Sequence, residues 1–247
     1  MSDPPEQPPE QSPESLTQRR QGRKGHRRTR IKICGLREVN TALAAVAAGA
    51  DLIGLNLVEA SPRFVSDDVA RKIAQNLPPG VTAVALVNHL THPNEVSELV
   101  SRTSIRCVQF HGQEDPTLAA TVEETDLVKA FPAEAVEDGE LIEVWSCYAN
   151  VKAFLWDAPS SPDNPLGGGS GHTSDWGWLA ERLPTSRPAI LAGGLTPDNV
   201  GEAIRTVRPY AVDVSSGVES SRGVKDHGLI RAFCEAVREA DASLAMD

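Results

Sequence analysis

The chain has 247 residues, of which 40% are hydrophobic, and a formal net charge of −10. This length fits one large domain or two small ones, and the negative charge argues against a general nucleic-acid-binding protein. The sequence contains no apolar run of the roughly 18 residues that a membrane span needs, and its start lacks the apolar core of a secretory signal. The four cysteines form no CxxC motif, so we expect free thiols and a cytoplasmic protein.

The first 30 residues differ in composition from the rest. Their first half is rich in Pro, Glu and Gln, and the stretch "RRQGRKGHRRTR" that follows is basic. Such a segment cannot bury a core, so we predict a disordered tail over residues 1–30 and a folded catalytic domain over residues 31–247. A solvated extension or a misassigned start codon explains the tail more simply than a site for RNA or for an acidic partner.

From residue 31 onward, short apolar runs alternate with segments of helical spacing. The predicted strands are, in order, "IKIC", "DLIGLNLV", "VTAVALV", "IRCVQF", "DLVKAF", "VKAFLWD", "PAILAG" and "AVDVSS". The predicted helices that follow them are "EVNTALAAVAAGA", "SDDVARKIAQNL", "HPNEVSELVSRT", "EDPTLAATVEE", a stretch near "AVEDGELIEVWSCY", "SDWGWLAERL", "TPDNVGEAIRTV" and "DHGLIRAFCEAVREA". Gly49 is a predicted helix stop, Ser66 a predicted helix cap, and Pro197 the predicted first residue of its helix.

These elements predict an α/β fold. Strands with little polar alternation are typical of parallel sheets that are buried on both faces. Eight strand–helix units over ~215 residues favour a (β/α)8 TIM barrel, and an open doubly wound sheet is the alternative.

Functional groups of a (β/α)8 barrel lie at the C-terminal ends of its strands. The ends of the first and sixth predicted strands carry Cys34 and Asp157, and the fourth is followed by His111. The loops after the last two strands, "AGGLTPDNV" and "SSGVE", combine glycines with helix starts, which suits a phosphate dianion. The alternative is that these glycines only shape turns. The candidate residues in and beside these loops are Gly193, Gly194, Asp213, Ser216 and Gly217.

The stretches "KICG", "SPRFVS", "VQFHGQE", "AGGLTPDNV" and "VDVSSGVESSRGVKD" together resemble the phosphoribosylanthranilate isomerase family of tryptophan biosynthesis. The resemblance covers the chain from about Ile31 to Ala240, in the family's order. It implies a (β/α)8 barrel that uses no metal and no organic cofactor. It also implies a small phosphorylated substrate and an Amadori rearrangement. From the charge and the lack of a long apolar run we expect no nucleic acid or membrane partner, and we expect a monomer or homodimer.

The resemblance also implies roles for individual residues. Cys34 corresponds to the general base and Asp157 to the general acid, while Arg63 of "SPR" would face the anthranilate carboxylate. An arginine fork suits that planar group. Asp213 is expected to orient the eighth strand's loop or to contact the substrate, and His111 either lines the pocket or makes a structural hydrogen bond.

Two features depart from the family pattern. The loop after Asp157 is longer than usual and has Ser170 where a Thr is common, and Trp156 replaces an aliphatic residue, which is expected to reshape the pocket. Of the remaining marked residues, Cys107, Cys147 and Cys234 lie in apolar contexts typical of core cysteines. A metal site at His89 and His92 is disfavoured, because no further ligand stands at a suitable spacing.

Three other functions compete with this interpretation. A Schiff-base aldolase would use Lys129 or Lys152, and a non-catalytic sugar-phosphate binder would need neither Cys34 nor Asp157. A related ketol-isomerase of histidine synthesis usually has Asp at the end of the first strand, where this chain has Cys34.

Overall fold

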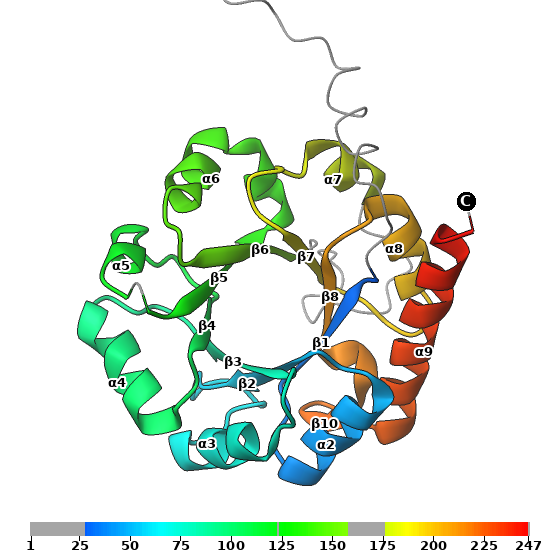
Figure 1. Ribbon diagram of the computed structural model, residues 1–247, viewed down its shortest axis with the longest axis horizontal. Helices are drawn as coiled ribbons and strands as arrows, with labels where there is room; N and C mark the ends of the chain where they lie inside the picture. The colour runs from blue at the N-terminus through cyan, green and yellow to red at the C-terminus, as the bar shows by residue number, and fades with distance from the viewer. Residues whose placement is uncertain (1–27, 123, 158–175, 247) are drawn as a thin grey trace, which may run out of the picture.

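The computed structural model describes residues 28–122, 124–157 and 176–246. In these residues eight parallel strands form a closed barrel in sequence order (Figure 1). The strands are β1 (Arg30–Cys34), β2 (Leu52–Asn56), β3 (Thr82–Val87), β4 (Cys107–Phe110), β5 (Asp126–Pro132), β6 (Val151–Asp157), β7 (Ala189–Ala192) and β8 (Ala211–Val214). The first and last strands pair in parallel, with Lys32 opposite Asp213. The predicted (β/α)8 barrel is therefore confirmed, and the open sheet is wrong.

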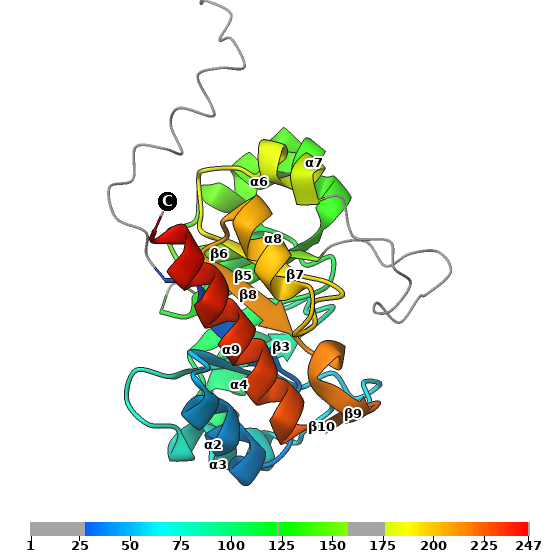
Figure 2. The same ribbon diagram turned by 90° about the vertical axis from the view of Figure 1, so that its right-hand side faces the viewer.

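Helices surround the barrel on its outside, and the long α9 crosses one side of it (Figures 1 and 2). The described helices are α2 (Val39–Ala48), α3 (Asp67–Asn76), α4 (Pro93–Thr103), α5 (Thr117–Ala120), α6 (Gly139–Ser146), α7 (Trp176–Arg182), α8 (Val200–Val207) and α9 (His227–Leu244). Two 3₁₀ turns, η1 (Ala133–Glu137) and η2 (Ser216–Val218), and a small hairpin of β9 (Glu219–Ser221) and β10 (Val224–Lys225) complete the described elements. None of the helices in these ranges is long and apolar enough to cross a membrane.

The helix boundaries follow from local chemistry. Gly49 ends α2 with a φ of 112°, a conformation that glycine adopts without strain. The Ser66 side chain accepts a hydrogen bond from the Val69 amide and caps α3. Both predicted boundary residues are confirmed.

The predicted start of α8 is wrong, because Pro197 lies in the turn before the helix and the helix begins at Val200. The Asn199 side chain organises this turn. Its carbonyl oxygen accepts from the Thr196 amide at 2.8 Å, and its nitrogen donates to the Gly194 carbonyl at 3.0 Å.

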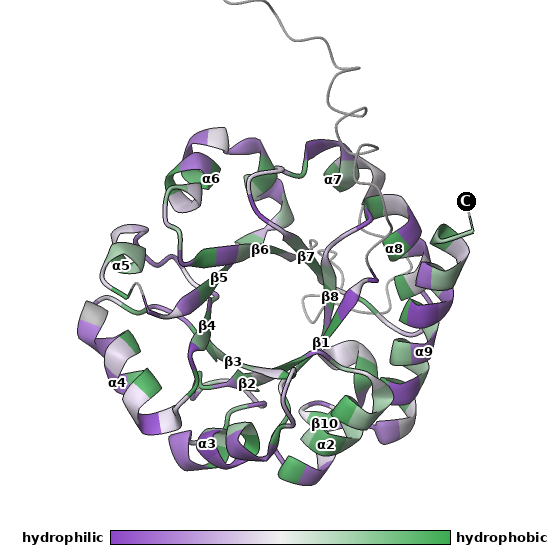
Figure 3. Cartoon of the chain, in the orientation of Figure 1, coloured by the Kyte–Doolittle hydropathy of each residue, from purple (hydrophilic) through white to green (hydrophobic). Residues whose placement is uncertain are grey.

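Each strand presents one set of side chains to the helices and the other to the barrel interior. On β6, Phe154 and Trp156 belong to the core between sheet and helices, whereas Leu155 belongs to a separate interior cluster. Trp156 stacks on Phe131 with ring centroids 5.3 Å apart. The prediction that Trp156 reshapes the pocket is therefore wrong, because the pleat turns it outward. The polar surface of the helices faces away from the strands (Figure 3).

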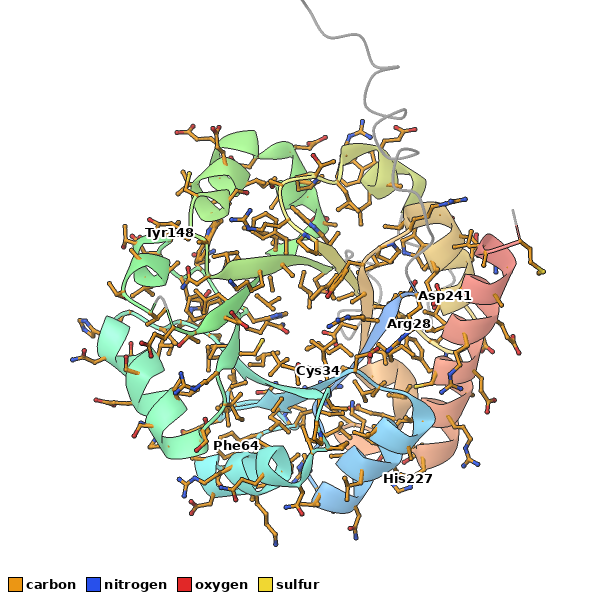
Figure 4. All side chains as sticks on the ribbon, viewed as in Figure 1. Arg28, Cys34, Phe64, Tyr148, His227 and Asp241 are labelled. Carbon is orange, nitrogen blue, oxygen red and sulfur yellow. The ribbon has the colours of Figure 1, made fainter. Side chains whose placement is uncertain are left out.

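The predicted tail falls largely on residues 1–27, outside the described ranges. The last residues of that segment join the barrel. Thr29 donates through its amide and its hydroxyl to the Asp241 carboxylate, at 2.7 Å each. Arg28 forms an ion pair with Asp51, and Arg30 begins β1. Figure 4 shows Arg28 and Asp241 near the start of β1.

Candidate active site

Cys34 is the last residue of β1 and lies at the rim of the barrel interior (Figure 4). Its side chain is directed toward β2, because a Cβ atom placed on Gly54 would lie 2.8 Å from the sulfur. Gly35 follows with a φ of 81° and donates its amide to the Gly54 carbonyl at 2.8 Å. Glycine at these two positions therefore makes the sharp exit from the strand and leaves room for the sulfur. Cys34 is 5% exposed.

A buried ion pair lies next to this thiol. Lys32 Nζ donates to Asp213 Oδ2 at 2.9 Å, and both residues are buried in the barrel interior. Burial raises the pKa of Cys34, the positive charge of Lys32 opposes this shift, and the negative charge of Asp213 adds to it. The net effect is a pKa above that of an ordinary thiol. Asp213 Oδ1 is buried and has no hydrogen-bond partner among the described residues.

Asp157 ends β6 and lies beside His111. His111 Nε2 is 3.9 Å from Asp157 Oδ2, and His111 Nδ1 is 3.2 Å from the Gln109 side-chain nitrogen. Burial raises the pKa of Asp157 above its ordinary value, although His111 opposes the shift and Asp213 reinforces it. His111 therefore makes the side-chain hydrogen bond that was one of the two alternatives stated for it, and it lies next to the candidate acid.

Cys34 and Asp157 share one end of the barrel, because β1 and β6 run in the same direction and each ends at the residue in question. Asp213 and Lys32 influence the pKa of both groups. The thiol and the carboxyl therefore lie at the same C-terminal mouth, and the same buried ion pair affects the pKa of each.

Arg63 is held by an acidic side chain of the β9–β10 hairpin. Its Nε and Nη2 donate to the two carboxylate oxygens of Glu219, at 2.7 and 2.9 Å. Lys225 Nζ also donates to Glu219, at 2.7 Å, and to the Ser215 carbonyl at 2.8 Å. Burial raises the pKa of Glu219, but hydrogen bonds from Arg63 and Lys225 outweigh it and bring that pKa to about 2.

The two predicted phosphate loops are in backbone contact. A Cβ atom on Gly217 would lie 1.9 Å from the Leu195 carbonyl oxygen, so only glycine allows the loops after β7 and β8 to approach this closely. Gly193 and Gly194 both have positive φ, at 87° and 61°, and no heavy atom lies within 4 Å of a Cβ atom placed on Gly194. Ser216 begins the η2 turn beside them. The loops after β7 and β8 are therefore adjacent.

Comparison with known proteins decides the family. The sequence profile described as "N-(5'phosphoribosyl)anthranilate (PRA) isomerase" matches residues 31–236. The chain belongs to the phosphoribosylanthranilate isomerase family. A relative from Leptothrix cholodnii, named N-(5'-phosphoribosyl)anthranilate isomerase, is 43% identical over 87% of this chain and 93% of its own. One of the same name from Dechloromonas aromatica is 42% identical over 88% of this chain and 100% of its own.

Solved structures of the family agree with the fold. Phosphoribosyl anthranilate isomerase from Thermotoga maritima superimposes with a TM-score of 0.73 at 35% identity, over 85% of this chain and 99% of that one. A crystal structure of the family in complex with reduced 1-(o-carboxyphenylamino)-1-deoxyribulose 5-phosphate has a TM-score of 0.71 at 32% identity, with the same coverage.

The lysines required by a Schiff-base aldolase do not face the mouth of this isomerase-family barrel. Val128 and Ala130 belong to the interior cluster, so Lys129 between them points outward, where it pairs with Glu114 at 2.8 Å. Lys152 is exposed at the start of β6 and donates to the Ala149 carbonyl. The aldolase hypothesis thus loses both of its candidate nucleophiles.

The other three cysteines differ in burial. Cys234 is buried, as predicted, and Cys107 is partly buried, but Cys147 is exposed because it follows the last residue of α6. Among the described residues, no group of three or more His, Cys, Asp or Glu side chains is arranged to hold a metal. The lengthened loop with Ser170 lies outside the described ranges.

Sequence reasoning missed three charged residues of the site, namely Lys32, Glu219 and Lys225. Lys32 had a detectable signal, because it stands two residues before Cys34 and shares its face of the strand. The contacts of Glu219 and Lys225 depend on the β9–β10 hairpin, which folds back over the loop after β2. No local sequence pattern predicts this arrangement.

Proposed function

We propose that this chain catalyses the Amadori rearrangement of N-(5'-phosphoribosyl)anthranilate to 1-(2-carboxyphenylamino)-1-deoxyribulose 5-phosphate, a step of tryptophan biosynthesis. Asp157 is the proposed general acid and Cys34 the proposed general base. The observation that carries this assignment is the position of a carboxyl with a raised pKa and a buried thiol at the same mouth of the barrel.

The first proposed step needs an acid. Asp157 gives a proton to the furanose ring oxygen while the bond from that oxygen to C1′ breaks, and the anilino nitrogen lone pair forms the iminium. An ordinary aspartate is ionised at neutral pH and has no proton to give. The raised pKa of Asp157 increases the protonated fraction that this step requires.

The second proposed step needs a base. The iminium acidifies the C2′ hydrogen, and the Cys34 thiolate removes it as a proton to leave an enolamine. The enolamine gains a proton at C1′ and loses one from the C2′ hydroxyl, which gives the ketone. Substrate and product are isomers, so the proton that Asp157 donates balances the one that Cys34 receives. General acid–base assistance of this kind typically contributes ~10²–10⁴-fold for each group.

The substrate's anionic ends have matching partners. The amides of Gly193, Gly194, Ser216 and Gly217 are proposed to bind the phosphate, because glycines leave the backbone accessible to a dianion. Arg63 is proposed to bind the anthranilate carboxylate with the edge of its guanidinium that Glu219 leaves available. Asp213 Oδ1, which is buried and has no hydrogen-bond partner in the described part of the chain, is proposed to accept a hydrogen bond from a sugar hydroxyl.

The proposed chemistry consists of proton transfers and one C–O cleavage, so it requires neither a metal nor an organic cofactor. A small phosphorylated molecule is the proposed partner, with no nucleic acid and no membrane, and the cytoplasm is the proposed location. We propose a monomer or a homodimer. A family structure from Thermotoga maritima is described as monomers generated from a dimeric enzyme, and light scattering of the full chain distinguishes the two states.

The test is conversion of phosphoribosylanthranilate by the purified chain, followed by the loss of anthranilate-type fluorescence. We expect Cys34→Ala and Asp157→Asn each to lower kcat by at least ~10²-fold while product binding is retained. Turnover like that of the parent chain in either variant would remove the acid–base assignment, and no turnover by the parent chain would remove the proposed reaction.

A further inference from the structure

A proton-abstracting thiol has to carry a negative charge, and the position of Cys34 opposes that charge. The side chain is 5% exposed, and the facing position on β2 is Gly54, which offers the sulfur no polar side chain. Burying an isolated anion is costly unless a counter-charge or hydrogen-bond donors compensate it. Stabilisation of the thiolate therefore has to come from charged side chains nearby.

The charged groups around the sulfur come from four different segments of the chain. They are Lys32 of β1, Asp213 of β8, Lys225 of β10, and Arg63 of the loop after β2. Arg63 and Lys225 already share the Glu219 carboxylate. Lys32 forms an ion pair with Asp213 at 2.9 Å and is 1% exposed, so its ammonium group is held in the interior.

Lys32 lies directly below the sulfur along the same strand face. Residues two apart on a strand point to the same side and are separated by about 6.6 Å along the strand. The long lysine side chain spans part of this distance, and the register places Asp213 opposite Lys32 on β8. The ammonium group donates to Asp213, and its positive charge lowers the pKa of Cys34.

We propose that Lys32 is a positioning residue of the reaction, which Asp213 holds in place by accepting its hydrogen bond, so that its ammonium group stabilises the thiolate form of Cys34. The proposal rests on the assignment of Cys34 as the base. Asp213 has two opposed effects in this arrangement. It keeps the ammonium in the barrel interior, and its own negative charge works against the thiolate.

This arrangement predicts that neutralising the two partners has opposite effects on the thiol. In Asp213→Asn the amide oxygen can still accept the hydrogen bond from Lys32 while the negative charge of the carboxylate is removed, which favours the thiolate. Removing the ammonium in Lys32→Met favours the neutral thiol. Damage to folding or packing would not produce shifts of opposite sign.

The experiment measures the alkylation of Cys34 by iodoacetamide as a function of pH, in the full chain and without substrate. The modified Cys34 peptide is quantified by mass spectrometry, so the other three cysteines need no substitution. Compared with the parent chain, Asp213→Asn is expected to shift the midpoint of the profile to lower pH, and Lys32→Met to shift it to higher pH. A neighbouring opposite charge typically changes the thiolate population by about tenfold or more.

Lys32→Met leaves a buried carboxylate unpaired and can prevent folding. The double variant Lys32→Met/Asp213→Asn avoids this problem, because the effect of Lys32 is then read against Asp213→Asn alone. We expect about tenfold slower alkylation in the double variant than in Asp213→Asn at a pH below both midpoints. The acidic limb of kcat/KM should move in the same direction as the alkylation midpoint.

Equal midpoints in Asp213→Asn and the double variant would overturn the proposal, as would shifts of the same sign in Asp213→Asn and Lys32→Met. If the midpoints move as expected while the acidic limb of kcat/KM does not, the thiolate is tuned by Lys32 but Cys34 is not the base. In that case the proposed reaction mechanism fails and the electrostatic role of Lys32 stands.

Discussion

Substitution of Glu219 is expected to affect both the stability of the protein and the binding of its substrate. Its side chain is 4% exposed and accepts hydrogen bonds from Arg63, Lys225 and the Gly223 amide. These donors bring its pKa to about 2, whereas an unfolded glutamate titrates near pH 4.3. A shift of roughly two units corresponds to about 3 kcal/mol at neutral pH. Because Arg63 is partly exposed, we reduce this to about 2 kcal/mol.

The sign of the pH dependence follows from the lowered pKa. Above about pH 4.3 the carboxylate is ionised in both states, and its full contribution is present. As the pH falls toward 2, the unfolded chain binds the proton first and the contribution is lost. Glu219→Gln should therefore lower the free energy of unfolding by about 2 kcal/mol at pH 7, and the difference from the parent chain should shrink as the pH falls from 4.3 to 2.

The assay is urea unfolding followed by circular dichroism between pH 7 and pH 3. Glu124→Gln is the matched control, because its side chain is 94% exposed and its carboxylate lies 3.8 Å from Arg106. It should change the free energy of unfolding by less than about 0.5 kcal/mol. A loss of stability in Glu219→Gln that is constant over this pH range would refute the reasoning. Since Glu219 also orients Arg63, the KM for phosphoribosylanthranilate should rise about tenfold while kcat changes less.

Three further predictions concern individual groups of the site. Gly217→Ala should raise KM by at least about tenfold and weaken competition by inorganic phosphate, because its Cβ would displace the Leu195 carbonyl; unchanged phosphate inhibition would contradict this role. Gly54→Ala should lower kcat with little change in KM, since its methyl group would meet the Cys34 sulfur at 2.8 Å. His111→Gln should move the alkaline limb of the kcat/KM profile to higher pH, because His111 lowers the pKa of Asp157 and activity requires that acid to be protonated. A limb that stays in place or moves to lower pH would show that Asp157 is not the titrating acid.

The barrel was predictable because each of its units carries its own signals. The Ser66 cap, the Gly49 stop and the apolar runs are local features, and their order alone indicates a barrel. Cys34 and Asp157 were placed at the same mouth because parallel strands all end there. By contrast, the Arg63–Glu219 pair joins residues 156 positions apart, and the Lys32–Asp213 pair joins residues 181 positions apart. Such residues become neighbours only when the barrel has closed, so no local sequence pattern identifies them as partners.

Two errors have a common origin in the strand pleat. Trp156 was expected in the pocket because it precedes the acid, and Lys129 was a candidate nucleophile because it is close to a strand end. Both lie on the outward side of their strands, next to residues that do face the interior. Counting by twos from Asp157, the candidate acid, corrects the assignment of Trp156 without coordinates, whereas the outward position of Lys129 comes from the structure.

The route by which the chain enters β1 has a consequence for protein engineering. Arg28 and Thr29 are attached to Asp51 and Asp241 at the start of the strand, whereas Cys34 stands at its far end. At about 3.3 Å per residue, the strand separates these two poles by roughly 13 Å. A reporter or second enzyme joined ahead of Arg28 is therefore attached at the N-terminal end of the barrel strands. The proposed substrate entrance at the C-terminal end stays open.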